Sequence, residues 1–145
     1  MRTTGLRSPY DKVGGLVFFG RLLDKLRLKG QGDFPSQWET EVSMAADGRC
    51  VRFLRMSYEA LEERAQQGGS DDELLEWCFQ YGRRPSNEDI QIWNAFMTKR
   101  GWRDDASDTL QQAKISAGLR HRADILTYFD LLEAAEVYDA EPDPH

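Results

Sequence analysis

The chain has 145 residues, of which 40% are hydrophobic and 30% are charged, and its formal net charge is −6. This length and composition fit one compact soluble domain, whose single core four Trp, five Tyr and seven Phe residues can fill. The longest uncharged apolar run, from Val13 to Gly20, is far shorter than the ~18 residues of a membrane-spanning helix, so we expect no membrane partner.

A long helix is predicted over residues 14–29, after an extended segment at residues 1–12. Gly30 and Gly32 are expected to end it. Because its first two turns are apolar nearly all round, the helix should be buried. Its inner stripe recurs at helical spacing and comprises Leu16, Phe19, Leu23 and Leu26.

The central part of the chain predicts a loop and four short helices. Residues 31–46 read as a loop anchored by Phe34 and Trp38, and Asp47 is a plausible N-cap of a helix over residues 49–55. Each later helix follows a capping serine and ends near a glycine. The serines are Ser57, Ser70 and Ser86, and the glycines are Gly68, Gly82 and Gly101.

Two more helices are predicted, over residues 106–117 and from about 122 to 137. The last one should point Glu133 to water and bury a stripe of Ile125, Leu126, Phe129 and Leu132. No segment alternates convincingly enough to be a strand. The sequence therefore predicts an all-α fold, a single compact domain of six or seven short helices over residues 1–137, with a loose acidic tail at 138–145.

Charge is distributed unevenly, because residues 1–30 carry seven basic and two acidic side chains whereas the remainder is strongly acidic. The acidic body argues against a nucleic-acid partner. On the first helix, Arg21, Asp24 and Lys25 share a face at spacings of three and four residues. Two cations beside one carboxylate leave a positive charge that could hold a phosphate or carboxylate group. The alternative is a solvated face with one internal ion pair, or packing against the acidic remainder.

Four further residues are candidates for the same ligand site. Arg7 and Tyr10 lie just upstream and could fold back over the first helix. Trp93 and Asn94 lie in an amphipathic helix, where Trp93 could equally be core and the amide of Asn94 needs either backbone or ligand partners. As a proton donor or acceptor Asp24 is weak, because neighbouring Arg21 and Lys25 should lower its pKa.

No metal site or cofactor is predicted. The only histidines are His121 and His145, which makes a zinc site very unlikely, and the acidic residues of the last helix are better explained as a solvated face. Cys50 and Cys78 lie in apolar surroundings without a CxxC motif. With no signal peptide at the N-terminus, we expect free thiols and a cytoplasmic protein.

Several segments in order resemble a bacterial family described as domain of unknown function DUF5069. The similarity covers residues 6–136, but Glu133-Ala-Ala-Glu136 replaces the acidic-glycine-arginine ending of the family pattern. The resemblance implies one small helical cytoplasmic domain and no particular activity. It rests on Leu6–Pro9, Gly14–Leu16 with Arg21, Asp24, Lys25 and Arg27, Arg52–Leu54, Trp93–Met97 with Arg100 and Gly101, and Asp124 with Thr127 and Phe129–Leu132.

Three hypotheses about function follow. The first is a small binding or interaction module whose first helix recognises an anionic ligand or an acidic segment of a partner protein. The second is a small enzyme acting on an anionic metabolite, in which Arg21 and Lys25 hold the anion and Asp24 or Tyr10 transfers a proton. The third is a structural homodimer, since the sequence leaves both catalysis and oligomeric state open.

Overall fold

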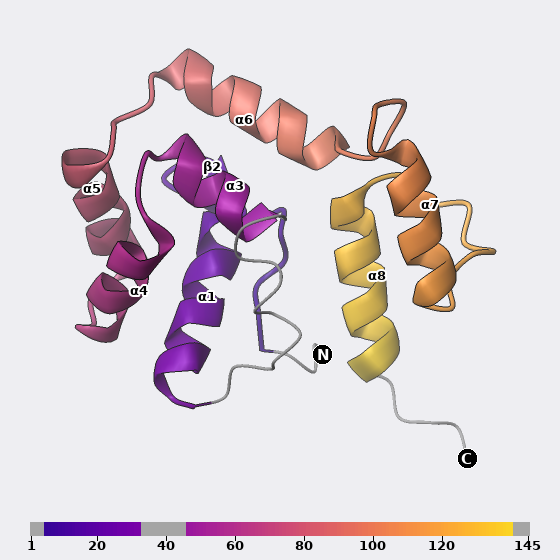
Figure 1. The fold of residues 1–145 in the computed structure, drawn as a ribbon, viewed down its shortest axis with the longest axis horizontal. Coiled ribbons are helices and arrows are strands. Elements are labelled where there is room, and N and C mark those ends of the chain that lie inside the picture. The colour runs from indigo at the N-terminus through magenta and orange to yellow at the C-terminus, as the bar shows by residue number, and fades with distance from the viewer. Residues whose placement is uncertain (1–4, 33–45, 141–145) are drawn as a thin grey trace.

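The computed structural model describes residues 5–32 and 46–140, with side chains described up to residue 135. This part of the chain forms seven helices and one two-stranded hairpin, which confirms the predicted all-α class (Figure 1). The predicted loop at residues 31–46 lies almost wholly outside the described residues, as do its proposed anchors Phe34 and Trp38. None of the described helices is both long and apolar enough to cross a membrane.

The predicted start of the first helix is wrong, because Gly14 and Gly15 form a hairpin turn instead. They connect β1 (Lys12–Val13) to β2 (Leu16–Val17) in an antiparallel pair. Both glycines have positive φ, 56° and 84°, which is what a two-residue hairpin turn requires and a helix does not permit. The helix itself, α1, spans Phe19–Gly30. The two strands have two residues each, which is too few to show the alternation of apolar and polar residues that predicts a strand.

The next four helices include three that have the predicted serine caps. The four are α3 (Ala46–Phe53), α4 (Tyr58–Gln66), α5 (Asp71–Tyr81) and α6 (Asn87–Lys99). The Ser57 hydroxyl accepts a hydrogen bond from the N–H of Ala60, and Ser70 and Ser86 each complete a capping box. The predicted role of Asp47 is wrong, because α3 begins before it and its buried side chain faces α1.

The C-terminal helices are α7 (Ser107–Ser116) and α8 (Tyr128–Ala140). The helix predicted from residue 122 thus begins six residues later, after a segment of turns. Because Leu126 lies in that segment, it is exposed instead of belonging to an inner stripe, whereas Ile125 is buried. The prediction for Glu133 is also wrong, since its carboxylate accepts a hydrogen bond from the Ser8 hydroxyl.

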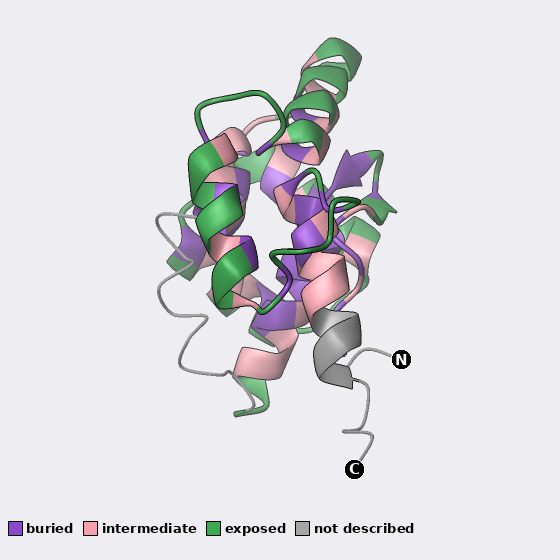
Figure 2. Cartoon of the chain, turned by 90° about the vertical axis from the view of Figure 1, so that its right-hand side faces the viewer, coloured by how far each residue is buried: buried purple, intermediate pink, exposed green. Residues whose placement is uncertain are grey.

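The helices enclose a large and a small hydrophobic cluster. The large cluster surrounds α1, which packs against α4 and β1, while α6 packs across β2 and reaches α8. In Figure 1, α6 spans the top of the molecule from α5 to α7 and α8, and Figure 2 shows exposed residues on the outer faces of the helices. The small cluster joins α7 to α8 and comprises Leu110, Leu119, Ile125 and Leu131.

Gly82 ends α5 where its backbone passes very close to the end of α3. A Cβ atom at this position would lie 2.0 Å from the carbonyl oxygen of Leu54 and 2.9 Å from that of Cys78. The next residue, Arg83, donates its backbone N–H to the same Leu54 oxygen over 3.0 Å. Neither oxygen is free to rotate away, so only glycine fits here.

We expect Gly82→Ala to lower the free energy of unfolding by about 2–3 kcal/mol, because the backbones of α3 and α5 would have to separate. Urea denaturation measures the loss. Gly118→Ala is the control, since a Cβ there meets nothing within 4 Å and only its φ of +75° opposes the change, at a cost of about 1 kcal/mol. Equal losses in the two variants would contradict the close approach.

Candidate functional site

The candidate residues predicted from the sequence fall into separate places in the structure. Arg7, Arg21 and Asp24 lie together beside α1, while Lys25 lies deeper in the interior. Tyr10 contacts α8, and Trp93 with Asn94 contacts the hairpin. The structure therefore brings three of the seven residues into one polar network and distributes the other four.

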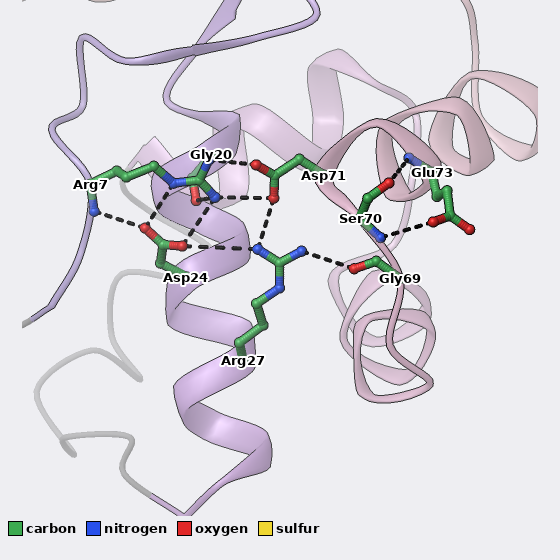
Figure 3. A network of polar contacts seen from close by, with 8 residues as sticks. All are labelled: Arg7, Gly20, Asp24, Arg27, Gly69, Ser70, Asp71 and Glu73. Atoms are coloured by element: carbon green, nitrogen blue, oxygen red, sulfur yellow. Dashed lines mark hydrogen bonds and ion pairs between the residues drawn. The ribbon is translucent and has the colours of Figure 1, made fainter.

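Arg7 is the centre of that network, which lies between α1 and α5 (Figure 3). Its guanidinium donates hydrogen bonds to the carboxylate of Asp24 over 3.0 Å and to that of Asp71 over 2.6 Å. Arg27 donates to the same Asp71 carboxylate over 2.8 Å. The two guanidinium groups of Arg7 and Arg27 thus face the two carboxylates of Asp24 and Asp71, and these four charges balance.

The pKa of Asp71 follows from these contacts. The hydrogen bond from Arg7 is the main reason that its pKa falls to about 2 from 3.8, against the opposing effect of partial burial, and Arg27 contributes further. The same contacts raise the pKa of Arg7 above its usual value. The two residues are therefore charged at any ordinary pH and hold α5 against the N-terminal segment.

The other two cations of the predicted site also point inward. Arg21 is buried and donates to the backbone carbonyl of Arg7 over 3.1 Å. Lys25 forms an ion pair with Asp47 of α3 at 3.1 Å, in which the two side chains are only 3% and 1% exposed. The positive charge of Lys25 is therefore met by an acid from a distant element, which the sequence did not identify as its partner.

Trp93 and Asn94 both bind the backbone of the hairpin. The indole N–H of Trp93 donates to the carbonyl of Val17 over 3.1 Å. The amide of Asn94 accepts from the N–H of Val17 over 3.1 Å and donates to the carbonyl of Gly15 over 2.8 Å. These contacts supply the amide partners that the sequence analysis required and attach α6 to β2.

Tyr10 secures the N-terminal segment to α8. Its hydroxyl donates to the carboxylate of Asp130 over 2.6 Å and lies 3.3 Å from the Thr127 hydroxyl, while its ring meets Phe129 edge-on. Burial, followed by the hydrogen bond to Asp130, raises the pKa of Tyr10 to about 12. The phenol therefore stays protonated near neutral pH.

A hollow of about 420 Å³ lies between α3 and α6, and we call it the α3–α6 groove. Its lining combines two cations with apolar and aromatic side chains, which is the composition of many ligand sites. Among the predicted candidates it includes Trp93. The lining residues are Arg49, Arg52, Phe53, Ile92, Trp93 and Phe96.

The positive charge of the groove is only partly balanced by described acids. Arg49 makes no ion pair with any carboxylate in the described part of the chain, and its guanidinium carbon lies 5.0 Å from the centre of the Phe96 ring. Arg100, 5.4 Å from the same ring, pairs with Asp105. Burial, then the charges of Arg100 and Arg52, lower the pKa of Arg49. Like charges are therefore held close together here.

Arg49 and Arg52 of this groove were not among the candidates predicted from the sequence. The available signal was the spacing of Arg49 and Arg52, three residues apart and directly before Phe53, which places the two cations near one another on a helix. That signal could not reveal the opposite wall, because α6 meets α3 only in the folded chain.

The thiols and metal-binding side chains suggest no further site. Cys50 and Cys78 are free and buried, and burial raises the pKa of Cys78 to about 12. Within the described residues, no group of three or more His, Cys, Asp or Glu side chains could hold a metal ion.

Comparison with known proteins gives one match. Residues 3–137 match the model of a family described as domain of unknown function (DUF5069). No curated protein and no solved structure matches the chain. The match covers both helices of the groove and every residue of the ion-pair network.

We expect Asp71→Asn to be less stable than the wild type at roughly pH 6, because the two arginines lose a charged partner. This difference should shrink as the pH falls through 3.8 towards 2, where the wild-type carboxylate also becomes protonated. Urea unfolding at several pH values measures it. Asp72→Asn, an exposed neighbour on the same helix, is the control. A constant difference down to pH 2 would contradict the ion-pair network.

Proposed function

This chain belongs to the DUF5069 family, and because that description carries no activity, we propose its function from the geometry of the candidate site. The protein is a small binding module that recognises an anionic group in the α3–α6 groove. The observation that carries this proposal is Arg49, a partly buried cation at an apolar hollow that makes no ion pair with any described carboxylate.

Local charge supports this proposal. Arg49 lies near two other guanidinium groups, and burial, followed by repulsion from Arg100 and Arg52, lowers its pKa. An anion entering the groove would relieve that repulsion. A partly desolvated guanidinium also attracts an anion more strongly than a fully hydrated guanidinium does. The groove thus favours negative charge although the whole chain carries a net charge of −6.

We place the ligand at this groove instead of at the first helix. There the cations are engaged by acids of the chain itself, Lys25 by Asp47 and Arg7 with Arg27 by Asp71. A ligand at that face would have to displace an internal carboxylate that is already well positioned. Arg49 forms no ion pair with a described carboxylate, and the acid that acts on it, Asp105, is largely exposed.

The enzyme and dimer hypotheses have weaker support. The carboxylate of Asp24 is engaged by Arg7. Tyr10 has a pKa of about 12, so its phenol is not poised to exchange a proton near neutral pH. A dimer would have to use exposed apolar side chains, of which Ile92 and Phe96 are the pair at the groove. Light scattering separates a dimer from a monomeric binding module by mass.

We expect inorganic pyrophosphate at tenfold its Kd to raise the Tm of the wild type by about 3–6 °C, which corresponds to about 1.4 kcal/mol. Arg49→Gln should lose this rise, because the glutamine keeps the polar side chain and removes the charge. The control is Arg122→Gln, an exposed arginine paired with Asp124 outside the groove lining. Scanning calorimetry at matched ionic strength measures the shift. An equal rise in wild type and Arg49→Gln would overturn the proposal.

Asp105 provides a second test of the same site. Its side chain is 84% exposed and pairs with Arg100, so it acts as an internal competitor for an anion at these arginines. We expect Asp105→Asn to bind pyrophosphate about threefold more tightly, in line with the loss of one exposed ion pair. Titration calorimetry measures the affinity, and Asp124→Asn makes the same charge change elsewhere. Tighter binding in both variants would indicate only a general charge effect and contradict competition at Arg100.

A further inference from the structure

The two walls of the α3–α6 groove differ in chemistry. The α3 wall presents the cations Arg49 and Arg52, whereas the α6 wall presents Ile92 and Phe96, whose side chains are 61% and 41% exposed. A purely inorganic anion would use only the first wall and leave the apolar wall in contact with water. The geometry therefore favours a ligand that is itself charged on one side and apolar on the other.

Planar groups already stack at this groove. The rings of Phe53 and Trp93 are 4.7 Å apart and inclined by only 24°. The guanidinium carbon of Arg83 lies 4.5 Å from the centre of the Phe53 ring, and Arg49 and Arg100 lie at Phe96. Trp93 itself is only 4% exposed, so a further planar ring would meet the exposed Phe96 beside this stack.

From these observations we propose that the groove binds a small molecule in which a planar aromatic ring is joined to an anionic group. The ring packs against Ile92 and Phe96 of α6, and the anion reaches Arg49 of α3. This inference rests on the proposed function and adds the class of ligand. Nucleotides and aromatic carboxylic acids share this chemistry. The hollow of about 420 Å³ lies within the ~300–1,000 Å³ typical of small-molecule sites.

The test compares a ring, an anion and their combinations by titration calorimetry. The probes are adenosine, inorganic pyrophosphate, ADP and 2-naphthoate. We expect ADP or 2-naphthoate to bind at least about tenfold more tightly than both adenosine and pyrophosphate, because stacking one ring contributes ~1–3 kcal/mol. The preferred compound then distinguishes a phosphate-bearing ligand from a carboxylate-bearing one.

Two matched isoleucine variants test whether the aromatic ring of the ligand packs against α6. Ile92→Ser should weaken binding of the better combined probe at least about threefold and leave pyrophosphate binding unchanged, because Ile92 contributes apolar surface and no charge. Ile115→Ser is the matched control, as Ile115 is an exposed isoleucine of α7 outside the groove lining. Both isoleucines are exposed, so neither substitution creates a cavity in a core.

The outcomes separate this inference from the proposed function. If pyrophosphate binds as tightly as the combined probes, or if Ile92→Ser changes nothing, the ring is not recognised and only this inference falls. If none of the four probes binds, or if adenosine binds as tightly as ADP, the groove does not recognise an anion and the proposed function falls with it.

Discussion

The ion pair between Lys25 and Asp47 fixes the orientation of α3 and therefore of the groove. Two charged side chains so deeply buried must remain paired, because separating them would leave an uncompensated charge in the interior. Successive residues of a helix are rotated by roughly 100°, so Asp47 facing α1 turns Arg49 and Arg52 by roughly 200° and 140° to the other side. The arginines thus reach the groove because Asp47, which precedes them in the same helix, is held in the core.

The opposite wall of the groove depends on hydrogen bonds instead of charge. Trp93 and Asn94 bind the backbone of β2 and of the Gly14–Gly15 turn, which fixes both the position and the rotation of α6. Ile92 and Phe96 flank these two residues and are therefore presented towards α3. Although the hairpin has only two residues in each strand, its backbone groups fix where α6 lies.

Local signals in the sequence predicted the helices well and the partners of charged residues poorly. The capping serines at positions 57, 70 and 86 act within one turn of chain, so their roles could be read directly and are confirmed. Asp47 was misread as a cap because its true partner lies 22 residues away on α1. The hairpin was missed because its strands have two residues each. The resemblance to the DUF5069 family, carried by ordered segments over most of the chain, is confirmed.

The two hydrophobic clusters differ greatly in size, and the free energy of local opening should therefore differ between the parts of the molecule that they hold together. α8 belongs to both, through Phe129 in the large cluster and Leu131 in the small one, whereas among the described residues α7 contributes to the small one alone. Regions with few buried apolar contacts open at a lower free energy than the rest of a domain. We therefore expect α7 and the turns after it to open as a separate unit and to exchange their amide hydrogens while α1 and its neighbours stay closed.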